Sequence, residues 1–253
     1  MLNAMLADFA VRLACGLAIL LVATPWRIVP PSFFRTHCLV ILGLLVLAVL
    51  DLSRSGAPSA LLAAVIAAAL LGYLGAVAWG IGWSRGGVPI AALIALVTGA
   101  ILVVSSRTAD AEVWALNAAG RLSSAFLLGS TLTAMLLGHH YLTAPAMSID
   151  PLKRFVRCMA WGLGVRSVVA ALGAWFWLEG RGAIVTPASV CSFFLAIRWG
   201  MGVAGPLLAT VLAWKTVRIR STQSATGILY VVVIFCFLGE LTGQLLRGSG
   251  VTL

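Results

Sequence analysis

Three charged side chains lie deep inside apolar stretches of this chain, where charge is rare. Arg166, Arg198 and Glu240 each lie well within a stretch long enough to cross a bilayer. A charged side chain at the centre of a membrane helix costs about 2.5–3.5 kcal/mol on insertion scales, so it usually faces other helices and pairs there. Glu240 also heads a polar stripe, because Gln244 and Arg247 follow it at helical spacing. We therefore expect these side chains to meet inside the protein.

Small residues share a helix face with each of the two arginines. Such faces pack against neighbouring helices, so both arginines should face protein, and an Arg198–Glu240 ion pair is expected. The small residues are Gly162 and Gly173 beside Arg166, and Cys191, Gly202 and Gly205 beside Arg198.

One carboxylate cannot neutralise two guanidinium groups, and this imbalance suggests a binding site. Asp8 does not fill the gap, because Arg12 lies one helical turn away and should pair with it. An unpaired buried cation favours an anion or an electron-rich carbonyl. Arg166, Arg198, Glu240 and Gln244 are therefore the predicted ligand-binding residues, for a quinone headgroup, a lipid phosphate or an anionic substrate. The alternatives are an ion pair that only locks two helices together, proton transfer, and a contact with another subunit.

Three histidines form a second candidate group. His139 and His140 end the fifth apolar stretch and His37 begins the second, so all three are expected at one end of a bundle. Adjacent helical residues point about 100° apart, and His140 is the one predicted to face the interior. Axial ligation of haem b needs a histidine from each of two helices, which makes His37 and His140 the candidate metal ligands. The alternatives are a quinone hydrogen bond and interfacial histidines that bind nothing.

Familiar catalytic and nucleotide-binding motifs give no support for an autonomous enzyme. Gly200–Gly205 matches G-x-G-x-x-G, but a dinucleotide site needs a preceding strand, whereas this match lies inside an apolar helix before Pro206. The chain has no G-x-S-x-G or H-E-x-x-H motif, and only seven acidic residues. The five cysteines show no C-x-x-C spacing and are expected to pack as small apolar residues. They are Cys15, Cys38, Cys158, Cys191 and Cys236.

Composition identifies the solvent of this chain as a membrane. Hydrophobic residues make up 62% of its 253 residues and charged residues 9%, whereas a soluble domain is about a quarter charged. A spanning helix needs about 20 apolar residues, and backbone in lipid must satisfy its own hydrogen bonds. The predicted fold is an all-α transmembrane bundle forming a single domain over 1–253, with eight spans. We place them near 7–25, 33–52, 58–80, 88–105, 119–142, 155–178, 186–213 and 223–246.

The longest connection, residues 105–120, contains a helix-start pattern. Asp110 and Glu112 precede Val113 and Trp114, which predicts a short helix at the membrane interface before the fifth span.

The net charge of +10 serves topology rather than nucleic-acid binding, because the 17 basic residues are spread over many loops. With both termini outside the cytoplasm, nine basic residues lie in cytoplasmic loops and five on the other side, as the positive-inside rule requires. The outer five are Arg54, Arg107, Arg121, Arg181 and Arg247. The predicted location is the inner membrane of a bacterium, with the bilayer and other membrane subunits as partners.

One short segment resembles a known family. Gly239-Glu240-Leu241-Thr242-Gly243 is similar to a Gly-Glu-Leu stretch in the last span of membrane anchor subunits of the dimethyl sulfoxide reductase type. The resemblance covers about a dozen residues and identifies no family. It implies eight spans, both ends outside, and a quinol site.

Three classes of function remain. The first is a membrane subunit of a redox or respiratory assembly that contacts quinone or haem. The second is a small transporter or lipid-handling protein, and the third is a structural or assembly protein without a small-molecule site.

Overall fold

The computed structural model describes residues 5–144, 147–176, 179 and 188–248. Within these residues the chain is helical without strands, and eight helical segments are long and apolar enough to cross a membrane. The prediction of an all-α bundle with eight spans is confirmed. The helices are α1 Met5–Ala23, α2 Pro31–Arg54, α3 Ser59–Gly80, α4 Ser84–Val104, α5 Ala111–Thr143, α6 Asp150–Phe176, α7 Ala188–Trp199, η3 Gly200–Ala204, α8 Gly205–Arg218 and α9 Thr222–Gly248.

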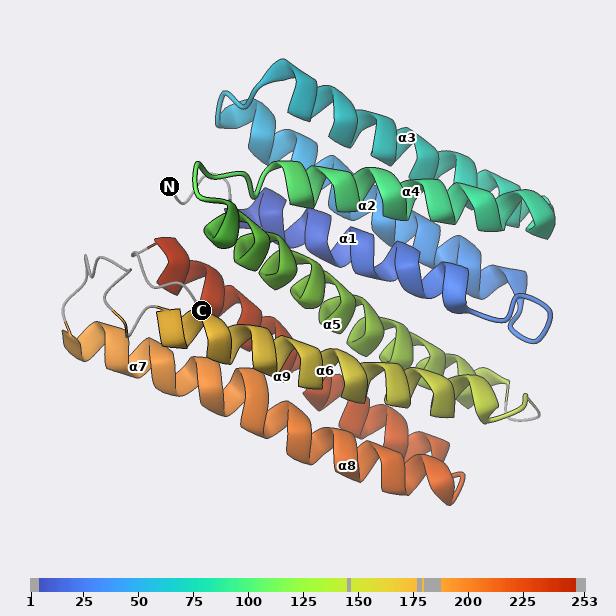
Figure 1. Ribbon diagram of the computed structural model, residues 1–253. Helices are drawn as coiled ribbons and strands as arrows, with labels where there is room; N and C mark the ends of the chain where they lie inside the picture. The colour runs from blue at the N-terminus through green and yellow to red at the C-terminus, as the bar shows by residue number, and fades with distance from the viewer. Residues whose placement is uncertain (1–4, 145–146, 177–178, 180–187, 249–253) are drawn as a thin grey trace.

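The eight spanning segments run side by side and alternate in direction, so that their ends gather at two ends of the bundle, and α7, η3 and α8 together make the seventh segment (Figure 1). One end holds the start of α1 and the end of α9, and we call it the terminal end. Among the contacts there, the backbone N–H of Ala7 donates to Oδ2 of Asp51 on α2 at 2.9 Å. The other end, where α1 finishes and α2 begins, is called the opposite end.

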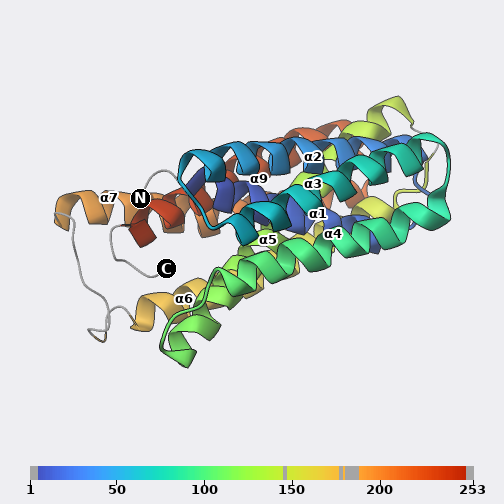
Figure 2. The ribbon, with the colours of Figure 1, turned by 90° about the horizontal axis from the view of Figure 1, so that it is seen from above.

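Helices α1 and α5 form the centre of the bundle, and the others pack around them. Helices α2 and α4 pack against α1 on one side, with α3 packed on α2 and α4. Helices α6 and α9 pack against α5 on the other side, with α8 packed on α6 and α9 (Figures 1 and 2). Both central helices are largely buried, whereas α3 and α4 expose most of their surface. The exposed side chains on these outer helices are mainly apolar, as a lipid-facing layer requires.

Two glycines let the central helices touch backbone to backbone. A Cβ on Gly16 of α1 or on Gly129 of α5 would overlap the backbone of the other helix. Without a hydrophobic driving force between helices in lipid, this close packing is a main source of association. Gly16 and Gly129 therefore fix the crossing of α1 and α5, around which the bundle forms.

The predicted interfacial helix is not a separate element. Asp110 caps α5, its Oδ1 accepting from the backbone N–H groups of Glu112 at 2.9 Å and Val113 at 3.4 Å. From there α5 runs without a break into the fifth span, so it begins at Ala111 rather than at residue 119. Trp114 Nε1 donates to the carbonyl of Val103 at 3.1 Å and ties this first part of α5 to α4.

The seventh span contains a π-helical turn at the G-x-G-x-x-G match. The backbone N–H of Gly205 donates to the carbonyl of Gly200, five residues back. Pro206, which has no N–H to donate, follows as the second residue of α8. A single π-turn inside a helix is a usual way to absorb such an irregularity.

We expect Gly129→Ala to lower the stability of the bundle, because the added methyl group would meet the Gly16 backbone. Overpacking of this kind costs about 1–3 kcal/mol, which lowers the apparent Tm in detergent by several degrees. Gly43→Ala is the matched control, since a Cβ there meets no atom within 4 Å. Alanine is favoured over glycine inside a helix, so the control should keep or raise the Tm. Equal Tm values for both variants would contradict this account of the crossing.

Candidate functional site

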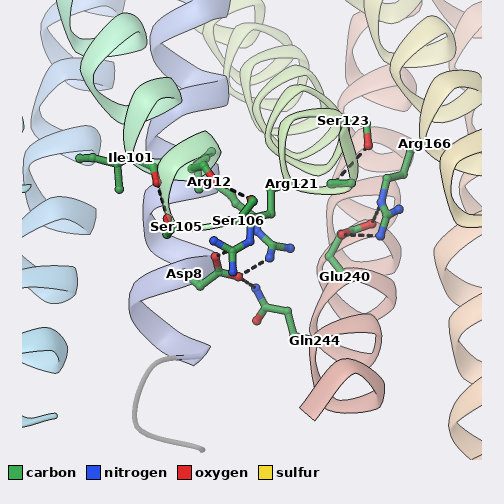
Figure 3. Close-up of polar contacts among 12 residues, drawn as sticks. Asp8, Arg12, Ile101, Ser105, Ser106, Arg121, Ser123, Arg166, Glu240 and Gln244 are labelled. Atoms are coloured by element: carbon green, nitrogen blue, oxygen red, sulfur yellow. Dashed lines mark hydrogen bonds and ion pairs between the residues drawn. The ribbon is translucent and has the colours of Figure 1, made fainter. Parts of the chain in front are cut away.

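Glu240 of α9 is paired with Arg166 of α6 inside the bundle. Arg166 Nε donates to Glu240 Oε1 at 2.7 Å, and Nη2 donates to Oε2 at 3.3 Å (Figure 3). Each side chain is 1% exposed. A two-point contact between guanidinium and carboxylate is the strongest form of this ion pair, so Arg166 is the main partner of Glu240.

Arg198 of α7 approaches the same carboxylate. Its Nη2 lies 3.4 Å from Glu240 Oε1, and the side chain is 1% exposed. The predicted Arg198–Glu240 contact is therefore confirmed, with the difference that Arg166 makes the closer one. Glu240 joins α6, α7 and α9, and two guanidinium groups share its single charge.

Small residues leave the space that Arg198 occupies. A Cβ on Gly243 would lie 3.1 Å from Arg198 Nε, and one on Gly202 would overlap its Nη1. Gly202 also meets Gly239 of α9 at backbone distance, since a Cβ there would lie 3.1 Å from the Gly239 Cα. The glycines of the seventh span thus serve helix packing and the placement of Arg198. The side chain of Cys191, expected on the same face, lies outside the described residues.

Gln244 belongs to a second polar group around Asp8. Its Nε2 donates to Asp8 Oδ2 at 3.1 Å. Arg12 pairs with the same carboxylate, as predicted, and Arg121 Nε of α5 lies 3.6 Å from Asp8 Oδ1 (Figure 3). Of the four predicted ligand-binding residues, the structure brings Arg166, Arg198 and Glu240 together and places Gln244 one turn of α9 further toward the terminal end.

A cavity of about 350 Å³ opens beside Asp8 at the terminal end. Four arginines line it against one carboxylate, that of Asp8, and we call it the arginine pocket. The bundle supplies its walls from the start of α1, the end of α4, the start of α5 and the end of α9. The full lining is Met5, Asp8, Arg12, Ser105, Ser106, Arg107, Thr108, Asn117, Arg121, Gln244 and Arg247.

Two of these arginines hold buried N–H groups that are unpaired among the described residues. They are Nε and Nη1 of Arg12, a residue that is 1% exposed, and Nη2 of Arg247. Buried polar groups are nearly always hydrogen-bonded in proteins. Arg247 also lines a small cavity of about 20 Å³ together with Arg166, which connects the surroundings of the two polar groups.

Sequence reasoning did not find the arginine pocket. It assigned Arg12 to its partner Asp8 and treated Arg107, Arg121 and Arg247 as loop charges that set topology. The available signal was Arg121, which falls inside the predicted fifth span rather than in the loop before it. Four helices far apart in sequence converge here, and no local pattern specifies that convergence.

The histidines lie at the opposite end. His139 is exposed, whereas His140 is half-buried with a buried Nε2, so the prediction that His140 faces the bundle is confirmed. The ring of Phe33 contacts both His37, at 4.1 Å between centroids, and His140, at 6.3 Å. His37 is fully buried, and its Nδ1 is hydrogen-bonded to the Phe33 carbonyl at 2.8 Å. Phe33 thus lies beside both candidate haem ligands, and haem ligation stays a prediction.

Comparisons with known proteins assign this chain to no family. No protein-family model, curated protein or solved structure matches the chain. The site must therefore be interpreted from its own geometry.

Within the described part of the chain, no cluster of three or more histidine, cysteine or acidic side chains could hold a metal ion. Cys15, Cys38 and Cys236 are buried, as expected for packing residues, and Cys158 is partly buried.

Glu240→Gln should destabilise the protein strongly, because Arg166 and Arg198 would stay buried without a counter-charge. Removing one partner of a buried ion pair costs about 3–5 kcal/mol, which corresponds to a fall in apparent Tm on the order of 10 °C. The exposed Glu112 on α5 provides the control variant Glu112→Gln, which should change the Tm far less, because interactions of an exposed carboxylate contribute little to stability.

Adding Arg166→Met to Glu240→Gln should restore part of the lost stability, since one of the two uncompensated cations is then gone. If the Glu240→Gln variant has the same apparent Tm as the wild type, the carboxylate does not hold these helices together.

Proposed function

We propose that this multi-pass membrane protein binds an anionic group in the arginine pocket and belongs to the transporter or lipid-handling class. The observation that carries the proposal is the excess of positive charge in the pocket. Arg12, Arg107, Arg121 and Arg247 line it, and Asp8 is the one carboxylate among the lining residues. Asp51 of α2, also at the terminal end, accepts a hydrogen bond from the backbone N–H of Ala7 and does not line the pocket.

The ion pairs deeper in the bundle do not relieve this excess. Glu240 is already shared by Arg166 and Arg198. Guanidinium groups without a counter-ion repel one another and are expensive to bury. Their planar N–H groups fit the oxygens of phosphate and carboxylate in pairs. An oxyanion in the pocket would supply the missing charge and would accept hydrogen bonds from Arg12 and Arg247.

A quinone fits the pocket less well than an anion does. A quinone headgroup is neutral and needs one or two hydrogen-bond donors, so it leaves the excess charge in place. An acidic segment of another subunit would also balance the charge. The protein would then be a structural or assembly protein that binds this segment in the pocket. Binding of a small anion by the purified chain separates these alternatives.

We further propose that the terminal end faces away from the cytoplasm of a bacterial cell, in the inner membrane. Nine basic residues flank helices at the opposite end. Arg107, Arg121 and Arg247 line the pocket, so they have a role other than topology. Among the described residues this leaves Arg54 as the outer-side cation that competes with those nine under the positive-inside rule.

Inorganic phosphate should raise the apparent Tm of the detergent-purified protein, compared with chloride at equal ionic strength. At ten times its Kd a ligand stabilises by about 1.4 kcal/mol, which is a few degrees for a chain of this size. Arg121→Gln should reduce this shift severalfold, because it removes one of the four guanidinium groups. Arg154→Gln, an exposed position on α6 at the opposite end, should keep it.

Identical Tm values in phosphate and chloride would argue against anion binding. Loss of the shift in both variants would place the effect outside the pocket.

Cysteine labelling should report the orientation of the bundle. A cysteine at Ser55, exposed at the terminal end, is expected to react with a membrane-impermeant maleimide in intact cells. A cysteine at Ser221, in the turn before α9 at the opposite end, should react only after permeabilisation. The wild-type chain with its own cysteines gives the background, and the reverse pattern would invert the proposed topology.

A further inference from the structure

We propose that the arginine pocket is the headgroup half of a lipid site, and that a chain of the same lipid lies in a groove between α3 and α4. The ligand is a lipid whose phosphate carries two negative charges, such as a phosphomonoester. This inference rests on the proposed anion binding and adds the class of molecule that delivers the anion.

The groove is a cavity of about 640 Å³ at the terminal end of α3 and α4. Apolar side chains line it apart from Ser105, and small residues such as Ala64 and Ala100 provide its width. Both helices belong to the exposed outer layer, so the groove opens toward the hydrocarbon of the bilayer. From Val97 to Ser105 it follows α4 for about 12 Å at 1.5 Å per residue.

Another cavity, of about 140 Å³, shares lining residues with both the groove and the arginine pocket. It shares Leu61 and Ile101 with the groove, and Asp8 and Arg121 with the pocket. Ser105, at the end of α4, lines all three cavities. These shared residues place the apolar groove and the arginines next to each other at the terminal end of the bundle.

The apolar groove and the charged pocket together determine which lipid fits. In a bilayer, an apolar groove alone would accept the chain of any lipid. The arginines at its inner end favour a lipid with an anionic headgroup, because they attract it and repel a cationic one. Four guanidinium groups against one carboxylate suit a doubly charged phosphate better than a singly charged phosphodiester. Arg121 lines both the cavity of about 140 Å³ and the pocket, so it lies where the phosphate and the chain would meet.

The test compares lipids and groove variants on the purified full-length protein in detergent, with bound lipid counted by native mass spectrometry. Long-chain phosphatidic acid should bind at least tenfold more tightly than phosphatidylcholine, and more tightly than phosphatidylglycerol. Dihexanoyl phosphatidic acid has the same headgroup but short chains, and it should bind at least tenfold more weakly than the long-chain form. Equal affinity of the wild-type protein for the two chain lengths would show that the groove does not bind the lipid chain.

Ala64→Phe and Ala100→Phe should fill the groove and weaken long-chain phosphatidic acid about tenfold, while the Tm shift by inorganic phosphate is retained. Ala67→Phe, on the exposed surface of α3 and outside the groove lining, is the matched control. The retained phosphate shift also shows that the variants are folded.

The outcomes separate the two proposals. Full binding of phosphatidic acid by both groove variants would overturn the lipid-chain assignment, while a phosphate shift in the wild type would keep the anion site. Absence of any phosphate or phosphatidic acid binding by the wild type would remove both. Equal binding of phosphatidic acid and phosphatidylcholine would show a groove without headgroup selection and would overturn this inference.

Discussion

The structure depends on a constraint that lipid imposes on charge: a buried guanidinium needs a negatively charged or hydrogen-bonding partner. Glu240 meets this constraint for α6 and α7 at once, through Arg166 at 2.7 Å and Arg198 at 3.4 Å. The attraction between these groups acts in a low dielectric, where removing one partner is far more harmful than it is in water. Helices α6, α7 and α9 are thereby linked through one carboxylate.

Helix α9, which bears Glu240, also contributes to the second polar group, nearer the terminal end. Gln244 lies one turn after Glu240 and binds Asp8, the carboxylate that Arg12 and Arg121 share. The two polar groups are thus spaced along α9 and receive side chains from α1, α5, α6 and α7. Each group has one carboxylate for two arginines, and Arg107 and Arg247 add to the excess in the pocket. The same deficit of acid thus occurs twice along α9, and the proposed anion binding rests on it.

Much of this fold follows from local patterns, whereas the site does not. Hydropathy predicts the eight spans, and helical periodicity predicts that Arg198 and Glu240 meet and that His140 faces inward. These are properties of single helices viewed along their own axes. The closer pairing of Arg166 with Glu240 depends on which helices are neighbours, and so does the convergence of Arg12, Arg107, Arg121 and Arg247. That information lies in contacts such as Gly16 against Gly129, where two helices far apart in sequence approach closely.

Two local features of the helices were not predicted by the sequence patterns either. Asp110 was identified as a helix start, but nothing in the sequence showed that the helix it caps continues into the fifth span. The π-turn at Gly200–Ala204 lies just before Pro206 and just after Arg198, the residue that contacts Glu240 of α9. Apolar periodicity cannot distinguish such a turn from ordinary helix.

The length of α5 has a consequence for depth in the membrane. Its 33 residues make a rod of about 50 Å, whereas the hydrocarbon core of a bilayer is about 30 Å thick and is crossed by about 20 residues. Counted back from Thr143, that span is used up at Ser123. With Thr143 at one edge of the hydrocarbon, Arg121 would lie at the other edge, near the level of the lipid phosphates. The first turns of α5 would then extend beyond the hydrocarbon, and the arginine pocket would lie in the layer that holds the anions of the bilayer itself.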